Sequence, residues 1–153
     1  MRLKMKEYLI KSSLETKNLG KRMAKMILKS SLSRAVVIGL IGDLGGGKTT
    51  FLQGFAKGLG TKEKILSPTF VIMKKFSIFN SPFSNFYHFD CYRIEKPKEI
   101  LELGFKEIIS NPKNIICIEW ADRIRNMLPL NSLFLIFKMI DEKTRKIIIK
   151  NKL

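Results

Sequence analysis

The chain has 153 residues, 45% of them apolar and 27% charged, a composition that predicts one packed domain over residues 1–153 and excludes an extensively disordered chain. Its formal net charge of +16 predicts attraction to nucleic acid or another polyanion, although AT-rich codon usage can also produce such a lysine-rich composition. No apolar run is long enough to cross a membrane and the first residues lack a signal peptide's apolar core, so we expect a cytoplasmic protein without a membrane partner.

Segments with strand patterns and segments with helical patterns alternate along the chain. Apolar or alternating runs bounded by turn residues predict strands at 7–10, 35–41, 69–79, 84–90, 114–119, 132–140 and 144–150. Helical spacing predicts helices from Ser12 to about Leu32, over 48–59, from Pro97 to about Leu103, and over 121–128. The pattern predicts an α/β fold in which helices cover a mixed sheet that ends in an antiparallel hairpin.

The strongest motif lies between the strand at 35–41 and the helix at 48–59. It reads Gly42, Asp43, Leu44, Gly45, Gly46, Gly47, Lys48, Thr49 and matches G-x-x-x-x-G-K-[ST] without a gap; Thr50 follows it. Glycines allow the backbone to wrap around phosphates, and the N–H groups of the loop and of the next helix then point at the anion. We expect Lys48 to reach the β- and γ-phosphates of a nucleotide and the Thr49 hydroxyl to hold Mg²⁺.

Two predicted strands end in acidic residues. Asp90 follows Phe86 to Phe89, and Glu119 follows the apolar run 114–118. Because the carboxyl ends of parallel strands meet at the ligand crevice of an α/β sheet, we expect both carboxylates to lie beside the phosphates. One would serve the metal and the other would orient water, and the spacing leaves open which does which.

Other candidate residues flank these positions. Thr69, after Ser67-Pro68, lies where switch-type nucleotide hydrolases place a hydroxyl that senses the γ-phosphate, although a β-branched residue can also simply open a strand. Trp120 follows Glu119 and is either a packing residue or a contact at the mouth of the nucleotide site. His88 is a candidate either for a bond near the metal or for a structural role.

The two cysteines complete the chemical inventory. Cys91 and Cys117 have no metal-ligand spacing, which is consistent with a reducing compartment. We interpret both as small apolar residues.

Taken in order, the segments GDLGGGKTTF, SPTF, HFDCYRI, ELGF and IEW resemble the TsaE (YjeE) family of P-loop ATPases that act in tRNA threonylcarbamoyladenosine biosynthesis. The resemblance implies a P-loop NTPase-like three-layer domain with a mixed, largely parallel central sheet. It also implies slow, partner-stimulated hydrolysis of ATP with Mg²⁺, which resets a transferase made of TsaD and TsaB during modification of tRNA at adenosine 37. Cys91 departs from the larger aliphatic residue that the family usually carries there.

By position, the resemblance assigns phosphate and Mg²⁺ binding to Lys48 and Thr49, a switch-like role to Thr69, and metal binding and catalysis to Asp90 and Glu119. It places Trp120 near the nucleotide. TsaD and TsaB family proteins are the expected partners. Direct contact with tRNA is left open, and DNA is not an expected partner.

Two other functions compete with this interpretation. A small-molecule kinase could use the same P-loop, with the arginines of ADRIRNML (Arg123 and Arg125) clamping phosphate, but no long arginine-rich lid segment is evident. A nucleotide-dependent switch could act by binding alone. A guanine-selective version of that switch is disfavoured because the chain has no NKxD sequence.

Overall fold

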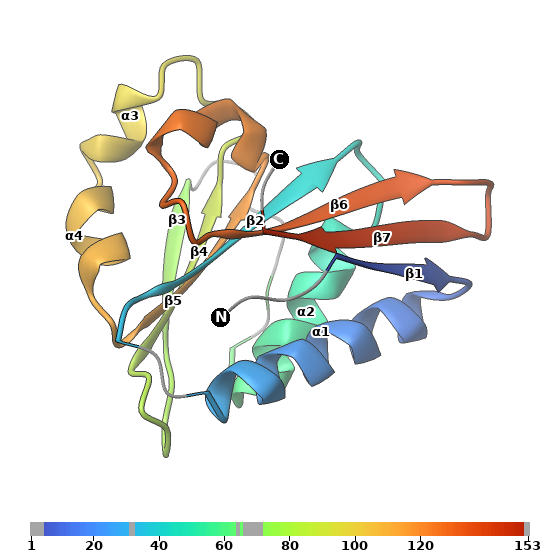
Figure 1. Cartoon of the computed structure of the whole chain (residues 1–153), viewed down its shortest axis with the longest axis horizontal. Coiled ribbons are helices and arrows are strands. Elements are labelled where there is room, and N and C mark those ends of the chain that lie inside the picture. The colour runs from blue at the N-terminus through green and yellow to red at the C-terminus, as the bar shows by residue number, and fades with distance from the viewer. Residues whose placement is uncertain (1–4, 31–32, 64, 66–71, 152–153) are drawn as a thin grey trace.

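A mixed sheet forms the middle layer of the molecule. The computed structural model describes residues 5–30, 33–63, 65 and 72–151. Within these residues the strands are β1 (Lys6–Ile10), β2 (Val36–Gly42), β3 (Met73–Ser77), β4 (Asn85–Asp90), β5 (Asn114–Glu119), β6 (Leu133–Met139) and β7 (Arg145–Lys150). Their order across the sheet is β1-β7-β6-β2-β5-β4-β3 (Figure 1). The central strands β6, β2, β5 and β4 pair in parallel, and β1, β7 and β3 add antiparallel pairs at the two sides.

Helices cover both faces of the sheet, so the predicted three-layer α/β architecture is confirmed. One face packs against α1 (Ser13–Leu28) and α2 (Lys48–Leu59) (Figure 1). The other face packs against α3 (Lys98–Leu101), α4 (Phe105–Ser110) and the 3₁₀ helix η1 (Ala121–Met127). None of the helices described is long and apolar enough to cross a membrane.

Strand β2 shows why the apolar run at 35–41 is continuous. Val36, Ile38 and Leu40 are buried in the core under α1 and α2, whereas Val37 is buried in the core on the opposite face. Successive side chains of a strand point to opposite faces, so a strand covered on both sides needs apolar residues at every position.

Most of the predicted elements are present, with different ends. Helix α1 begins after Ser12, whose side chain accepts a hydrogen bond from the Glu15 N–H at 3.2 Å, as the capping pattern predicts. It ends at Leu28, however, rather than near Leu32. Strand β3 covers only Met73–Ser77 of the predicted 69–79, and residues 69–71 lie outside the described residues.

The helix predicted from Pro97 to about Leu103 is wrong in its extent. Helix α3 ends at Leu101, and a second helix, α4, begins at Phe105, where the sequence analysis placed none. Gly104 separates them with φ +76°, a conformation that stops an α-helix and that glycine adopts at little cost. The apolar periodicity continues through the break, since Ile100, Phe105 and Ile108 fill the same core, so the pattern hides the turn.

Helices α1 and α2 approach each other closely at glycines. A Cβ atom on Gly54 would lie 2.0 Å from the Lys17 carbonyl oxygen, and one on Gly20 would lie 2.3 Å from the Phe51 carbonyl oxygen. Both obstacles are backbone atoms, which cannot turn aside as a flexible side chain can. The packing of α1 on α2 therefore requires residues without a side chain at these positions.

We predict that Gly54→Ala lowers the free energy of unfolding by about 1–3 kcal/mol, the usual cost of overpacking. In an unobstructed helix the same change would add up to about 1 kcal/mol, because alanine is the better helix former. Urea unfolding measures the difference, with Lys57→Ala on the exposed side of α2 as the control. A Gly54→Ala variant more stable than the wild type would contradict the close packing.

Candidate functional site

The glycine-rich loop connects β2 to α2 and leans on β6. Gly42 has φ +147°, and a Cβ atom there would lie 2.4 Å from the Phe137 carbonyl oxygen. Gly47, with φ +101°, precedes the first residue of α2. The loop therefore combines a backbone conformation and a closeness to β6 that only glycine satisfies, and it delivers the N-terminus of α2 to the end of the sheet.

Lys48 lies buried at the start of α2 and turns back toward its own loop. Its ammonium group donates to the Asp43 carbonyl at 3.0 Å and to the Gly42 carbonyl. Burial lowers the pKa of Lys48, while the nearby Glu119, Asp43 and Asp90 carboxylates oppose that shift. The Lys48 amino group is thus held by backbone carbonyls and faces acidic neighbours.

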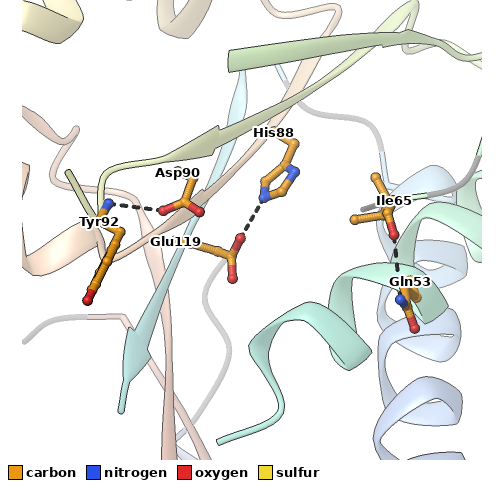
Figure 2. A network of polar contacts seen from close by, with 6 residues as sticks. All are labelled: Gln53, Ile65, His88, Asp90, Tyr92 and Glu119. Carbon is orange, nitrogen blue, oxygen red and sulfur yellow. Dashed lines mark hydrogen bonds and ion pairs between the residues drawn. The ribbon is translucent and has the colours of Figure 1, made fainter. Parts of the chain in front are cut away.

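Asp90 and Glu119 lie side by side at the carboxyl ends of adjacent parallel strands. They are register partners in β4 and β5, and Glu119 is also the register partner of Leu40 in β2, close before the glycine loop. Figure 2 shows the two carboxylates next to each other. The structure therefore brings both acids to the end of the sheet where the loop begins.

A single pocket of about 390 Å³ joins the loop and the acids, and we call it the glycine-loop pocket. Its lining residues are Leu44, Gly45, Gly46, Gly47, Lys48, Thr49, Thr50, Asp90, Tyr92, Arg93, Glu119 and Trp120. Gly42 and Asp43 lie at the base of the loop and face Lys48 through their carbonyl groups. Ten of the twelve lining residues are ones that the sequence analysis named, namely the seven from Leu44 to Thr50, the two strand-end acids and Trp120.

Glu119 is buried and paired with His88. The Nε2 atom of His88 lies 2.8 Å from the Glu119 Oε2 atom, and both side chains are almost wholly buried (Figure 2). His88 lies two residues before Asp90 on β4. Strand β4 therefore supplies Asp90 and also the partner that holds the Glu119 side chain. The sequence analysis left the role of His88 open, and the structure places it against Glu119.

Asp90 is half-buried and partly committed to its own turn. Its Oδ1 atom accepts a hydrogen bond from the Tyr92 N–H at 2.9 Å (Figure 2). Burial raises the pKa of Asp90, and the neighbouring Glu119 carboxylate raises it further, whereas the Tyr92 bond, His88 and Lys48 oppose the shift. Asp90 therefore lines the pocket with one of its carboxylate oxygens engaged by its own turn.

Trp120 forms one wall of the pocket in a strained conformation. Its φ of +56° is uncommon for a residue other than glycine. The Lys48 ammonium lies 4.4 Å from the centre of the Trp120 ring, and the Tyr92 ring lies 5.1 Å from it. The Arg123 guanidinium stacks against both rings. Backbone strain of this kind is typical of functional sites, and here it directs the indole toward Lys48.

The remaining predicted residues are distributed as follows. Thr69 lies outside the described residues. Cys91 and Cys117 are fully buried, and burial raises the pKa of the Cys91 thiol to about 12 and that of Cys117 well above its usual value. Both thiols are therefore protonated at neutral pH and pack as apolar groups.

Sequence reasoning missed one residue that supports the loop. Arg145 of β7 donates to the Gly45 carbonyl at 3.3 Å, although the two residues are a hundred positions apart. No local pattern carries such a contact, because it depends on the hairpin of β6 and β7 folding back beside β2.

Comparison with known proteins agrees with this architecture. The family model for "Threonylcarbamoyl adenosine biosynthesis protein TsaE" matches residues 10–147. The chain belongs to the TsaE family. The TsaE protein of Rickettsia typhi is 36% identical over 144 residues, which cover 94% of this chain and 93% of that protein. The TsaE protein of Bacillus subtilis is 40% identical over 111 residues, which cover 72% of this chain and 66% of that protein.

A solved structure supports the same assignment. The crystal structure of Bacillus subtilis YdiB superimposes with a TM-score of 0.73 at 30% identity, covering 97% of this chain and 86% of that one. The fold shared with YdiB therefore covers nearly the whole chain, and the glycine-loop pocket and both acids lie inside the residues that the TsaE family model matches.

We predict that His88→Leu lowers the free energy of unfolding by about 1–3 kcal/mol, because it leaves the buried Glu119 carboxylate without its partner. His88→Gln, whose amide can donate to the same carboxylate, should recover part of that loss. Urea unfolding of the two variants and the wild type checks the order of stability. Equal stability of His88→Leu and the wild type would show that the pair contributes nothing.

Proposed function

We propose that this chain binds ATP with Mg²⁺ in the glycine-loop pocket and hydrolyses it in the bacterial cytoplasm. We further propose that it is the ATP-hydrolysing subunit of the machinery that makes threonylcarbamoyladenosine at position 37 of tRNA. Its turnover would reset a transferase formed by TsaD and TsaB family proteins. Membership of the TsaE family supports the pathway, since the family is described by its part in threonylcarbamoyladenosine biosynthesis.

The observation that carries the proposal is the presence of the glycine loop, Lys48, Asp90 and Glu119 in one pocket. The loop and the start of α2 supply N–H groups and the positive end of a helix dipole, which suit a polyphosphate. The two carboxylates can orient water or hold the metal, which are roles that phosphate binding alone does not require. A site for passive anion binding would have no use for two acids beside the phosphates.

Lys48 would change partners when a nucleotide binds. In the structure its ammonium is held by the Gly42 and Asp43 carbonyls and rests beside the Trp120 ring. Phosphate oxygens carry more negative charge than backbone carbonyls and would draw the ammonium toward them. Trp120 would then lose its cation contact, so its fluorescence would report nucleotide binding.

The oxygen atoms of the pocket suit Mg²⁺. Thr49 supplies a hydroxyl, and Asp90 and Glu119 supply carboxylates, all of them ligands that this ion prefers. Within the described residues no group of three His, Cys, Asp or Glu side chains gathers around one point, as a site made wholly by protein would require. Mg²⁺ bound with a nucleotide usually keeps several waters and shares the phosphates, and it neutralises charge that develops on them.

The two acids would divide the remaining work. Glu119 is held by His88, whereas Asp90 accepts the Tyr92 N–H with one of its oxygens, and both acids line the pocket. Between them they would hold the metal or its water shell and orient the attacking water. Thr69, proposed as the switch-like hydroxyl, would add a sensor for the γ-phosphate.

We predict that Lys48→Ala removes ATP binding, whereas Asp90→Asn and Glu119→Gln keep ATP affinity near that of the wild type and lower turnover by roughly 100-fold or more. Equilibrium dialysis with labelled ATP measures binding, because Lys48→Ala itself removes the cation contact on which the Trp120 fluorescence signal depends. Phosphate release measures turnover. Unchanged affinity in Lys48→Ala would remove the phosphate assignment. Wild-type turnover in both acid variants would remove their catalytic roles.

We predict that a mixture of TsaD and TsaB family proteins accelerates ATP hydrolysis by this chain. The measurement is a coupled ATPase assay with and without the pair, using Glu119→Gln as the background control. Full activity of the isolated chain, with no response to the pair and with phosphate transferred to an added small-molecule acceptor, would identify a kinase instead.

A further inference from the structure

A second hollow lies away from the glycine-loop pocket, across the outer surfaces of α1 and α2. It has a volume of about 520 Å³, larger than the glycine-loop pocket at about 390 Å³, and the two share no lining residue. Four lysines line it, which are Lys17 and Lys21 of α1, Lys57 of α2 and Lys62 just beyond α2. We call this feature the α1–α2 groove.

The groove lies where the two helices pack closely at a glycine. Gly54 lines it, and the absence of a side chain there lets the Lys17 backbone come close. Lys17 and Lys21 are four residues apart, so they share one helix face about 6 Å apart along the axis. The basic groups are thus mounted on two helices that are locked together.

The lysines of the groove lack acidic partners. Within the described residues, the ion pairs involve Lys74, His88 and Lys146, and none involves a groove lysine. Glu63 also lines the groove, but its carboxylate lies 3.6 Å from the Lys74 ammonium. Counted over its described lining, the groove carries four lysines and one carboxylate, so its net charge is positive.

We propose that the α1–α2 groove binds the phosphate backbone of RNA. The inference goes beyond the proposed function and relies on it only for naming tRNA as the RNA. It assigns RNA binding, one possible role of the net charge of +16, to a single surface.

The chemistry of the groove favours a nucleic acid backbone over an acidic protein segment. Beside the lysines it offers the side-chain amide of Asn18 and that of Gln53, whose nitrogen also donates to the Ile65 carbonyl at 3.5 Å (Figure 2). Side-chain amides and lysine are the usual donors to phosphate and sugar oxygens. Among the described residues that line it there is no aromatic side chain and no arginine, the groups on which bases stack. We therefore expect salt-sensitive binding that reads backbone and shape and shows little preference for base sequence.

The test compares two variants that lose the same charge. The groove variant replaces Lys17, Lys21, Lys57 and Lys62 with Gln. The control variant replaces Lys96, Lys98, Lys106 and Lys113 with Gln. These lysines are exposed; Lys98 and Lys106 belong to α3 and α4, and Lys96 and Lys113 lie in turns close to those helices in the sequence. Binding of an unmodified tRNA transcript is titrated at several salt concentrations, and the affinity for ATP is measured for each protein.

We expect the groove variant to lose at least about 10-fold in tRNA affinity at 0.1 M salt and its salt slope to fall by about three, since four phosphate contacts are removed. The control variant should lose less than about 3-fold. ATP affinity and the melting temperature should stay at wild-type values in both. Should the groove variant prove unstable, the pairs Lys17→Gln/Lys21→Gln and Lys57→Gln/Lys62→Gln test each helix separately.

Three outcomes would overturn the proposal. Equal losses in both variants would show that the overall charge, rather than the groove, attracts tRNA. Wild-type tRNA affinity in the groove variant would exclude the groove as the RNA contact. Loss of binding to poly-glutamate, with tRNA binding kept, would identify an acidic protein partner instead. Because tRNA binding is measured without ATP turnover, the test of the groove remains valid even if the chain proves not to hydrolyse ATP.

Discussion

The parallel pairing of β4 with β5 and of β5 with β2 is the constraint on which the site depends. It aligns Asp90 with Glu119 and places Glu119 beside Leu40, two residues before Gly42. A shift of one residue in either pairing would turn the whole strand over and move its acid to the opposite face. Apolar packing opposes such a shift only weakly, because these strands are apolar at every position and would bury apolar side chains on both faces in either register. Polar contacts such as His88 with Glu119, and Asn85 with Asn114 at 3.0 Å, add a register that apolar packing does not specify.

The pocket gathers charges where burial makes them costly. Glu119 and Lys48 are both buried, and Asp90 is half-buried, so each loses hydration that its neighbours must replace. In the structure each has found a substitute: His88 for Glu119, backbone carbonyls for Lys48, and the Tyr92 N–H for Asp90. Lys48 has the least specific of these partners, because carbonyl groups are neutral. It is therefore the group with the most to gain from an incoming phosphate, and the fold keeps it close to where such a ligand would lie.

Features that depend on residues close together in the chain could be predicted from the sequence, whereas features that depend on distant residues could not. The glycine loop, the buried strands and the capping of α1 by Ser12 depend on residues that are close in the chain, and their patterns are readable directly. The nearness of Asp90 and Glu119 follows from a general rule about parallel strands and needs no knowledge of distant contacts. The break at Gly104, the support of Gly45 by Arg145 and the glycine contacts of α1 with α2 depend on tertiary packing. From the sequence, a glycine within a helical pattern predicts a less stable helix. Only the position of the Lys17 backbone in the structure shows that Gly54 is required.

Helix α2 connects the glycine-loop pocket with the α1–α2 groove, yet the distance between the two leaves little electrostatic coupling. The helix begins at Lys48 in the glycine-loop pocket and carries Lys57 in the α1–α2 groove. Nine residues of α-helix separate them by about 13 Å along the axis, which exceeds the Debye length of about 8 Å at physiological salt. Between charges that face solvent at this distance salt screens most of the interaction, so a polyanion in the groove would repel a bound nucleotide only weakly. Any influence of one surface on the other must instead pass through displacement of α2 as a body, which the glycine contacts with α1 oppose.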